Sequence, residues 1–297
     1  LALLLPGGAA HARIVGVRVG PCTLEAPASA GAAVSALSPV VPRVLQHIET
    51  ELGAGPRAPF VLALLPPHVD DAALAALDRG APPWAAGFMM PARRIGAIRL
   101  AAASRQPWSS PESAMAHELT HLVLHDADDD RLPRWFDEGV AMYEERRFSP
   151  PDLLGWGIEL ARGTPPTLAQ VSQSFPAAEG GAARAYAMSS AFVGWSVRRH
   201  GPDFLRRVVV AARTAEFARA WSLAAGVSLA SDEAAWRAGA TRDRFWLLAT
   251  ASGPLWLGGA LLVVLGAARR RAQMRAQRGR WRDEERRRPP LVDDGPA

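Results

Sequence analysis

The sequence predicts an α+β fold: a small N-terminal sheet, mixed or antiparallel, with helices, then a mainly helical part, and near the end a single transmembrane helix. Three observations predict it. Short apolar runs bounded by proline and glycine, typical of strands, occur before residue 110. Between residues 111 and 242 the apolar residues recur at helical spacing. Residues 245–268 then form an uncharged apolar run.

The N-terminal part, residues 13–110, alternates expected strands and helices. Residues 38–52 predict a helix because their apolar positions recur every three to four residues. The run PFVLALLP, residues 59–66, is continuously apolar between two prolines and predicts a buried central strand. The other expected elements are a strand at 13–19, a helix at 70–77 and two short extended pieces around Pro91.

The following part, residues 111–242, is expected to be mainly helical. Its first helix is well signalled, because Ser110 can cap it, Pro111 suits the first helical position and Glu112 is an acid in the first turn. The expected helices are 111–125, 132–146, 151–162, 183–200, 202–214, 216–225 and 231–238.

Both ends of the sequence indicate a membrane. Residues 1–12 are an apolar run ending in Ala-His-Ala, which fits a signal-peptide remnant cleaved after Ala12; the alternative is an apolar strand. As a helix, residues 245–268 extend about 35 Å and can span a bilayer; the alternative is a buried core helix. Arginines follow at once, so residues 269–297 are expected to be a basic cytoplasmic tail.

Composition excludes several classes of site. The net charge of +5 reflects the tail, where ten arginines stand against five acidic residues. The rest of the chain is nearly neutral and has no basic run with interleaved aromatic residues, so we expect no nucleic-acid partner. Cys22 is the only cysteine, which excludes an intrachain disulfide and a thiolate cluster. Any metal must therefore be held by nitrogen and oxygen.

The main chemical signal is the segment HELTH, residues 117–121. His117 and His121 are four residues apart, so on a helix their imidazoles lie on one face and can share a metal ion. Glu118 projects about 100° away around the helix axis, beside that ion but out of line with the ligands. This is the HExxH pattern, in which the glutamate acts as a general base.

A catalytic zinc site needs a third protein ligand. Glu138 is the better candidate, because it lies seventeen residues beyond His121 on the next expected helix, and one reversal of the chain returns its carboxylate to the first helix. His125 is separated from His117 by about 12 Å of helix rise and is expected to be a polar residue at the helix end.

Three other interpretations of this region fit the residues less well. The metzincin extension is absent, because Leu124 and Ala127 stand where it requires glycine and histidine. The acidic run at 126–130 lacks the glycine and distal glutamate of an EF-hand and is expected to be a solvated loop. An intramembrane protease needs its HExxH in an apolar span, whereas acidic residues border this one.

An HExxH helix followed by W-x-x-E-G-x-A resembles the gluzincin zinc metallopeptidases, especially the small peptidase-MA-like bacterial domains. The two motifs read HELTH and WFDEGVA in this sequence and are specific. The similarity continues more weakly through TLAQVSQSF and ARAYAMSSAFVGWSVRRHG and covers roughly residues 85–237.

The resemblance implies a zincin-like helical domain with Zn²⁺ as its cofactor. It implies His117, His121 and Glu138 as zinc ligands and Glu118 as the general base. Zinc lowers the pKa of its bound water to about 7, and Glu118 can then accept a proton during attack on a peptide bond.

Two further side chains have expected roles. The resemblance favours Tyr186 over Tyr143 as the donor that stabilises the oxyanion; the alternative for Tyr186 is a phenol packed between helices. Asp137 adjoins the ligand glutamate and is a candidate to orient a histidine. Thermolysin-like enzymes carry such an aspartate four positions after the ligand, where this chain has Met142.

The leading hypothesis is a zinc metallopeptidase that acts on peptides or proteins. It is expected in a bacterial cell membrane as a single-pass protein with a periplasmic or extracellular catalytic domain, in contact with lipid through its one transmembrane helix. The alternative is a non-catalytic zincin-fold binding or scaffold protein of the envelope, against which the retention of Glu118 argues. Residues 95–100 are expected to form the edge strand on which a substrate pairs.

Overall fold

The five strands form one mixed sheet in the order β1-β2-β3-β5-β4. In this computed structural model the described residues are 14–79, 83, 85–105, 109–128, 131–145, 166–173 and 179–239. Strands β2, β3 and β5 run parallel, whereas β1 and β4 pair antiparallel at the two edges. The bounds are β1 Ile14–Val19, β2 Cys22–Pro27, β3 Phe60–Leu65, β4 Gly87–Met90 and β5 Ile95–Arg99. The expected α+β class and mixed sheet are confirmed.

Strand β2 was not expected from the sequence. Its residues alternate, with Cys22, Leu24 and Ala26 buried and Thr23 and Glu25 partly buried, as in a strand with one face on the core. A tight turn at Gly20, whose φ is +58°, joins it to β1. The Pro- and Ala-rich composition of this stretch concealed the alternation.

The prediction that residues 95–100 form an edge strand is wrong. β5 is paired on both sides, with β3 through Ile95–Arg99 and with β4 through Ile95–Ile98. The second of the two extended pieces therefore lies inside the sheet, and the first, β4, forms its edge. Backbone pairing on both sides leaves β5 no free edge for a substrate.

The first helices are η1 Ala28–Ala30, α1 Gly31–Leu37, α2 Val40–Leu52, α3 Ala72–Arg79, η2 Pro91–Arg93 and α4 Leu100–Ala103. Of these, η1, α1, α3 and α4 contact strands of the sheet, and α2 contacts α5 (Pro111–Asp128) and α10 (Phe204–Ala212). The apolar positions expected on the helix at 38–52 are buried in α2, and this helix ends at Gly53 in the left-handed conformation.

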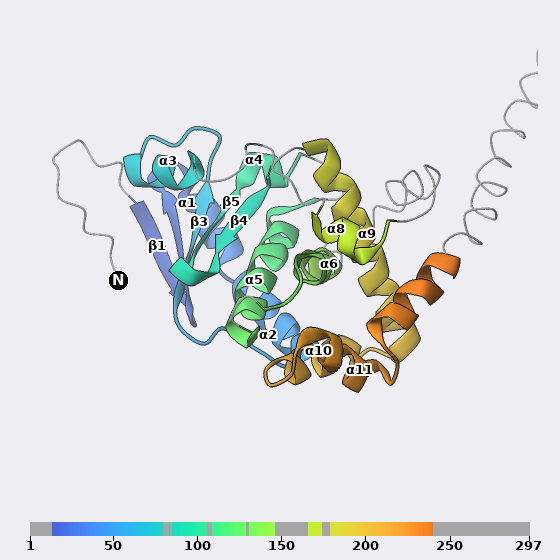
Figure 1. Ribbon diagram of the computed structural model, residues 1–297. Helices are drawn as coiled ribbons and strands as arrows, with labels where there is room; N and C mark the ends of the chain where they lie inside the picture. The colour runs from blue at the N-terminus through green and yellow to red at the C-terminus, as the bar shows by residue number, and fades with distance from the viewer. Residues whose placement is uncertain are drawn as a thin grey trace, which may run out of the picture. The chain divides into compact units, whose positions relative to one another are not determined.

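Helices follow, as expected, although the short α8 was not predicted. They are α5 Pro111–Asp128, α6 Arg134–Glu145, α8 Leu168–Gln173, α9 Glu179–His200, α10 Phe204–Ala212 and α11 Phe217–Ala225, and residues 229–239 are helical as well. In Figure 1, α5 lies between the sheet and α6, and it contacts both α6 and strand β4. This central helix carries the HELTH segment.

The helical part is packed around aromatic side chains. Trp135 of α6 has edge-on contacts with Phe136, Phe192 and Trp221, at centroid distances of 5.6, 5.4 and 6.0 Å. Asp232 is fully buried and accepts hydrogen bonds from Trp221 Nε1 at 2.9 Å and His200 Nε2 at 2.8 Å. The core thereby fixes the start of α6, which follows closely on the HELTH helix in the chain.

Several predictions fall outside the described residues. These are the signal-peptide remnant (1–12), the helix at 151–162, the transmembrane helix (245–268) and the basic tail (269–297). Among the described helices, none is by itself long and apolar enough to cross a bilayer; residues 28–37 and 40–52 reach that length and composition only jointly, with a 49° bend between them. The contacts divide the chain into units 1–241 and 242–297, and every described residue belongs to the first.

Candidate metal centre

Helix α5 holds the two histidines in a fixed relation. Its start is stabilised by reciprocal hydrogen bonds, since Ser113 N–H donates to Ser110 Oγ at 3.1 Å and Ser110 N–H donates to Ser113 Oγ at 3.0 Å. One turn apart, His117 and His121 bring their Nε2 atoms to 3.2 Å from each other. The two rings meet edge-on, with centroids 4.9 Å apart.

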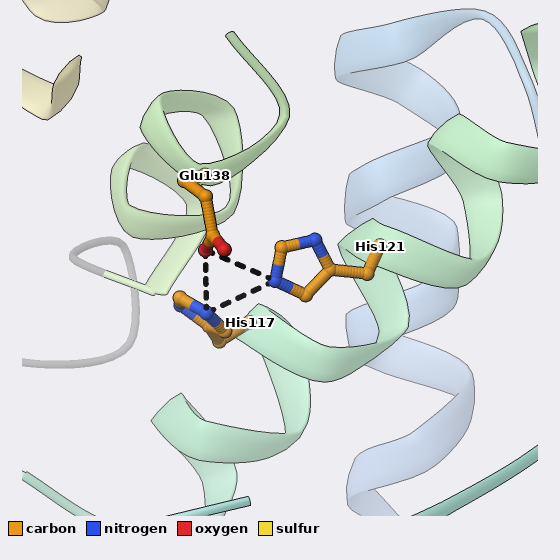
Figure 2. Close-up of side chains that lie close together, drawn as sticks. All are labelled: His117, His121 and Glu138. Carbon is orange, nitrogen blue, oxygen red and sulfur yellow. Dashed lines mark hydrogen bonds and ion pairs between the residues drawn. The ribbon is translucent and has the colours of Figure 1, made fainter. Parts of the chain in front are cut away.

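Glu138 of α6 completes a triangle with these nitrogens (Figure 2). Its Oε2 lies 3.5 Å from His121 Nε2 and 3.8 Å from His117 Nε2. Ligand atoms about 2.0–2.2 Å from one tetrahedral ion lie about 3.3 Å apart, so the observed spacing fits such an ion. The structure brings together the three residues expected as ligands, and they form a donor set of two imidazoles and one carboxylate.

The outer nitrogen of each imidazole faces a carboxylate. His121 Nδ1 lies 2.9 Å from Asp137 Oδ2, and His117 Nδ1 lies 3.2 Å from Glu145 Oε2. These contacts leave both Nε2 atoms directed at the centre of the triangle. Asp137 was a candidate for this position from the sequence. Glu145 was missed, although it lies two helical turns after Glu138 on the same face of α6, a spacing that the sequence contains.

The charges of this cluster shift its pKa values in opposite directions. Burial lowers the pKa of His121, but the charge and hydrogen bond of Asp137 and those of Glu138 outweigh burial, and the pKa is raised well above its usual range. Burial also lowers the pKa of His117, and Glu145 reverses this. For Glu138, burial raises the pKa, but the hydrogen bond and charge of His121 bring it down to about 2.

The second oxygen of Glu138 has a different neighbour. Arg134, one turn earlier on α6, places its Nε 3.6 Å from Glu138 Oε1. Arg134 also donates a hydrogen bond to the phenol of Tyr186. Burial first and the charge of Glu138 second raise the pKa of Tyr186. The structure therefore places Tyr186, from α9, beside the triangle and keeps its hydroxyl protonated.

Glu118 lies on α5 between the ligand histidines in sequence but outside their triangle. It is buried, with 6% of its surface exposed, and burial raises the pKa of its carboxyl group. The nearby Glu138 and Glu145 raise this pKa further, while the two histidines lower it. A carboxylate with a raised pKa is suited to accepting and returning a proton.

A cavity of about 360 Å³ opens beside the triangle. Its lining combines apolar side chains, members of the metal cluster and two other polar residues: Met89, Pro91, Leu124, Leu132, His121, Asp137, Glu138, His125 and Arg134. This space is large enough for one substrate side chain next to the ligands. His125 lines the cavity and is outside the triangle, as its position at the helix end predicts.

The first part of the acidic run after His125 is not the solvated loop that we expected, whereas residues 129 and 130 lie outside the described residues. α5 continues to Asp128, and Asp126 and Asp128 are 5% and 2% exposed. Asp126 accepts hydrogen bonds from Arg94 Nη1 at 2.8 Å and from Arg57 N–H at 2.8 Å. Asp128 pairs with Arg131, three residues later, at 2.8 Å. The main cation of Asp126, Arg94, is distant in sequence and allows this carboxylate to be buried; the two could not be paired from the sequence alone.

Comparison with known proteins agrees with this geometry. No curated protein matches the chain. The family model of the Peptidase MA superfamily matches residues 69–241, more than half of the chain, and this range includes β4, β5 and both helices of the metal centre. The chain belongs to the Peptidase MA superfamily and carries a peptidase-type hydrolase domain of that family.

Proposed function

We propose that the protein is a zinc-dependent metallopeptidase of the gluzincin type. The convergence of His117 Nε2, His121 Nε2 and Glu138 Oε2 from two helices carries the proposal. Two imidazoles and a carboxylate are the ligand set of catalytic zinc in several peptidases, and three protein ligands leave a fourth position for water. Asp137 and Glu145, which contact the outer ring nitrogens, support the same assignment.

Glu118 is the proposed general base. When bound, zinc polarises the peptide carbonyl and lowers the pKa of water. Glu118 accepts the proton of the attacking water and then passes it to the departing amine. Its buried carboxyl group, with a raised pKa, suits both transfers. Tyr186 keeps its proton and donates a hydrogen bond to the oxyanion that develops on the substrate.

Strand β4 is the proposed binding edge for the substrate backbone. It pairs with β5 on one side, and its other side has no strand partner within the described residues. Met89 of β4 and His121 of the metal triangle both line the cavity. An extended peptide added antiparallel or parallel to β4 therefore lies beside the ligands and directs one side chain into this space.

Replacing Glu118 tests the function against its alternative, a binding or scaffold protein. With the purified full-length chain and a peptide library, we expect hydrolysis by the wild type, loss of hydrolysis with a chelator, and recovery with Zn²⁺. The Glu118→Gln variant should bind zinc normally and lose hydrolysis by about 10²-fold or more. Equal behaviour of wild type and variant would favour the scaffold.

Membrane anchoring is proposed on the sequence alone. The uncharged run at 245–268 and the arginines that follow it support one span with a cytoplasmic tail and the peptidase domain on the opposite side of a bacterial membrane. In cells, a reporter enzyme active only outside the cytoplasm should be active when fused after residue 242 and inactive when fused after residue 297. The reverse pattern would contradict this topology.

A further inference from the structure

Gly87 begins the edge strand β4, and its backbone conformation does not require a glycine. The glycines with positive φ in the described part of the chain are Gly20, Gly53, Gly201 and Gly226. Gly87 has an ordinary strand conformation, paired with Ile98 of β5. A residue with a Cβ can adopt this backbone, so the reason for glycine must lie in the space around it.

That space is filled by Glu118. A Cβ on Gly87 would lie 2.9 Å from Glu118 Cγ, 2.9 Å from Glu118 Oε1 and 2.9 Å from the carbonyl oxygen of Ala97. Carbon atoms in contact are normally about 3.5–4.0 Å apart. The Glu118 side chain, including one carboxylate oxygen, therefore packs directly on the Cα of Gly87, at the point where α5 contacts β4.

We propose that Gly87 is a positioning residue for Glu118. The edge strand acts as a stop against which the carboxylate lies, and a side chain at this position displaces the carboxylate from the metal ligands. The catalytic consequence rests on the proposed function. The packing itself does not, because the contact exists whether or not Glu118 transfers a proton.

The effect of Gly87 on Glu118 can be distinguished from an effect on zinc binding. His117, His121 and Glu138 come from α5 and α6, and none of them supplies one of the three atoms nearest to a Cβ on Gly87. We expect Gly87→Ala to retain the zinc affinity of the wild type in a competition assay with a chelating dye, and to lower kcat by about 10²-fold, the size of a general-base contribution. A loss of zinc affinity parallel to the loss of activity overturns the proposal.

Gly16→Ala is the matched control. Gly16 lies in the other antiparallel edge strand, β1, and a Cβ there would meet Leu24 O at 3.5 Å and Glu25 Cγ at 3.6 Å, which are ordinary contacts. This variant should keep wild-type kcat. A shorter base adds a second test: in the Glu118→Asp background, Gly87→Ala should cost much less activity than in the wild type. Equal losses in the two backgrounds overturn the proposal.

A melting cycle separates this inference from the proposed function. In metal-free protein, Gly87→Ala should lower the melting temperature more in the wild type than in Glu118→Ala, because only the wild type has the carboxylate in place. Additive shifts overturn the inference even if the protein hydrolyses peptides. If Gly87→Ala alone fails to fold while the double variant folds, the contact with Glu118 is supported; if both fail, the Ala97 carbonyl dominates and the proposal is wrong.

Discussion

At the scale of single residues, His117 and His121 each have one ring nitrogen next to a carboxylate and the other in the triangle with Glu138. Asp137 contacts His121 and Glu145 contacts His117. A hydrogen bond from Nδ1–H to a carboxylate fixes the ring and leaves Nε2 unprotonated for a metal. Both carboxylates come from one helix, α6, and each contacts a different histidine.

Removal of either carboxylate should weaken metal binding. We expect Asp137→Ala and Glu145→Ala each to reduce zinc affinity by about 10–100-fold, the usual effect of losing a partner of a ligand histidine. Competition with a chelating dye measures this. Asp203→Ala is the control, since the Asp203 side chain is 64% exposed and its nearest basic partner, Arg206, is 3.8 Å away. An unchanged affinity in both site variants would show that these contacts do not orient the rings.

Zinc affinity should also depend on pH. In the metal-free protein the pKa values of His117 and His121 are raised, so both rings hold their protons to a higher pH than an ordinary histidine does. Zinc must displace these protons, so its affinity should continue to rise with pH beyond about pH 6.5, the ordinary histidine pKa. The affinity should fall as the pH is lowered through the raised pKa values of the two histidines. Calorimetric titration in two buffers of different ionisation enthalpy measures the protons released; no release at pH 6.5 contradicts the expectation.

At the scale of helices and strands, the close packing of α6 against α9 explains why a glycine, Gly139, follows Glu138. A Cβ on Gly139 would lie 2.8 Å from the Ser189 carbonyl oxygen and 2.8 Å from Val193 Cγ2. Helices α6 and α9 therefore approach each other closely at this point, and the same approach sets the position of Glu138 and Tyr186 on the two helices.

Gly139→Ala should destabilise the protein although alanine favours helices. Glycine to alanine within a helix normally stabilises by up to about 1 kcal/mol; here the clash with α9 should cost about 1–3 kcal/mol. Gly194→Ala in α9 is the control, because its Cβ would meet only Arg198 Nη1 at 3.5 Å and Tyr143 Cδ2 at 3.9 Å. Denaturant unfolding should show opposite signs for the two variants, and the same sign would refute the close-approach explanation.

The turn between β4 and β5 is tied to α5 by one ion pair. Arg94, which has a φ of +56°, places Nη1 and Nη2 at 2.8 and 3.0 Å from the two oxygens of Asp126. Burial raises the pKa of Asp126, but Arg94 outweighs burial and the pKa is lowered. The pair therefore stabilises above the ordinary pKa of about 3.9, and this stabilisation is lost as the pH falls through the lowered value.

Breaking this pair should loosen the edge strand. We expect Arg94→Met to lower the free energy of unfolding by about 3 kcal/mol, because it leaves Asp126 buried without its main cation. Asp126→Asn should remove the acid-dependent loss that this carboxylate contributes below about pH 4. Urea unfolding at several pH values tests both. Arg43→Met is the control, since Arg43 pairs with Glu112 on the surface, with 63% of its side chain exposed.

Local sequence patterns predicted the helices and strands better than they predicted which of these elements lie next to one another. Helical spacing located α2, α5 and α6 to within a few residues, and the HExxH spacing with a later glutamate identified all three members of the triangle. The order of strands in a sheet has no local signal, so β5 was assigned to the edge and β4 was not. For the same reason, Gly87 beside Glu118 and Arg94 beside Asp126 could not be paired: each contact crosses more than thirty residues of chain.

At the scale of the whole molecule, a bound metal should stabilise the domain as well as its site. The ligands come from α5 and α6, and α5 also packs on α2, β4 and β5. A ligand that binds only the folded state stabilises by about 4 kcal/mol at a thousand times its Kd. Zinc should therefore raise the melting temperature by several degrees, and chelator should reverse the shift. In Glu138→Ala the shift should be nearly absent; a full shift in that variant would place the ion elsewhere.

The ordering of these parts along the chain has a consequence for biogenesis. The three donor atoms come from residues 117–138, a span short enough to close at little entropic cost once α5 and α6 exist. The stop provided by β4 belongs to the sheet, whose strands all precede α5 and leave the ribosome first. Because the donor atoms come from α5 and α6 alone, metal content reports the pairing of these two helices, whereas turnover would also depend on the contact of Glu118 with β4.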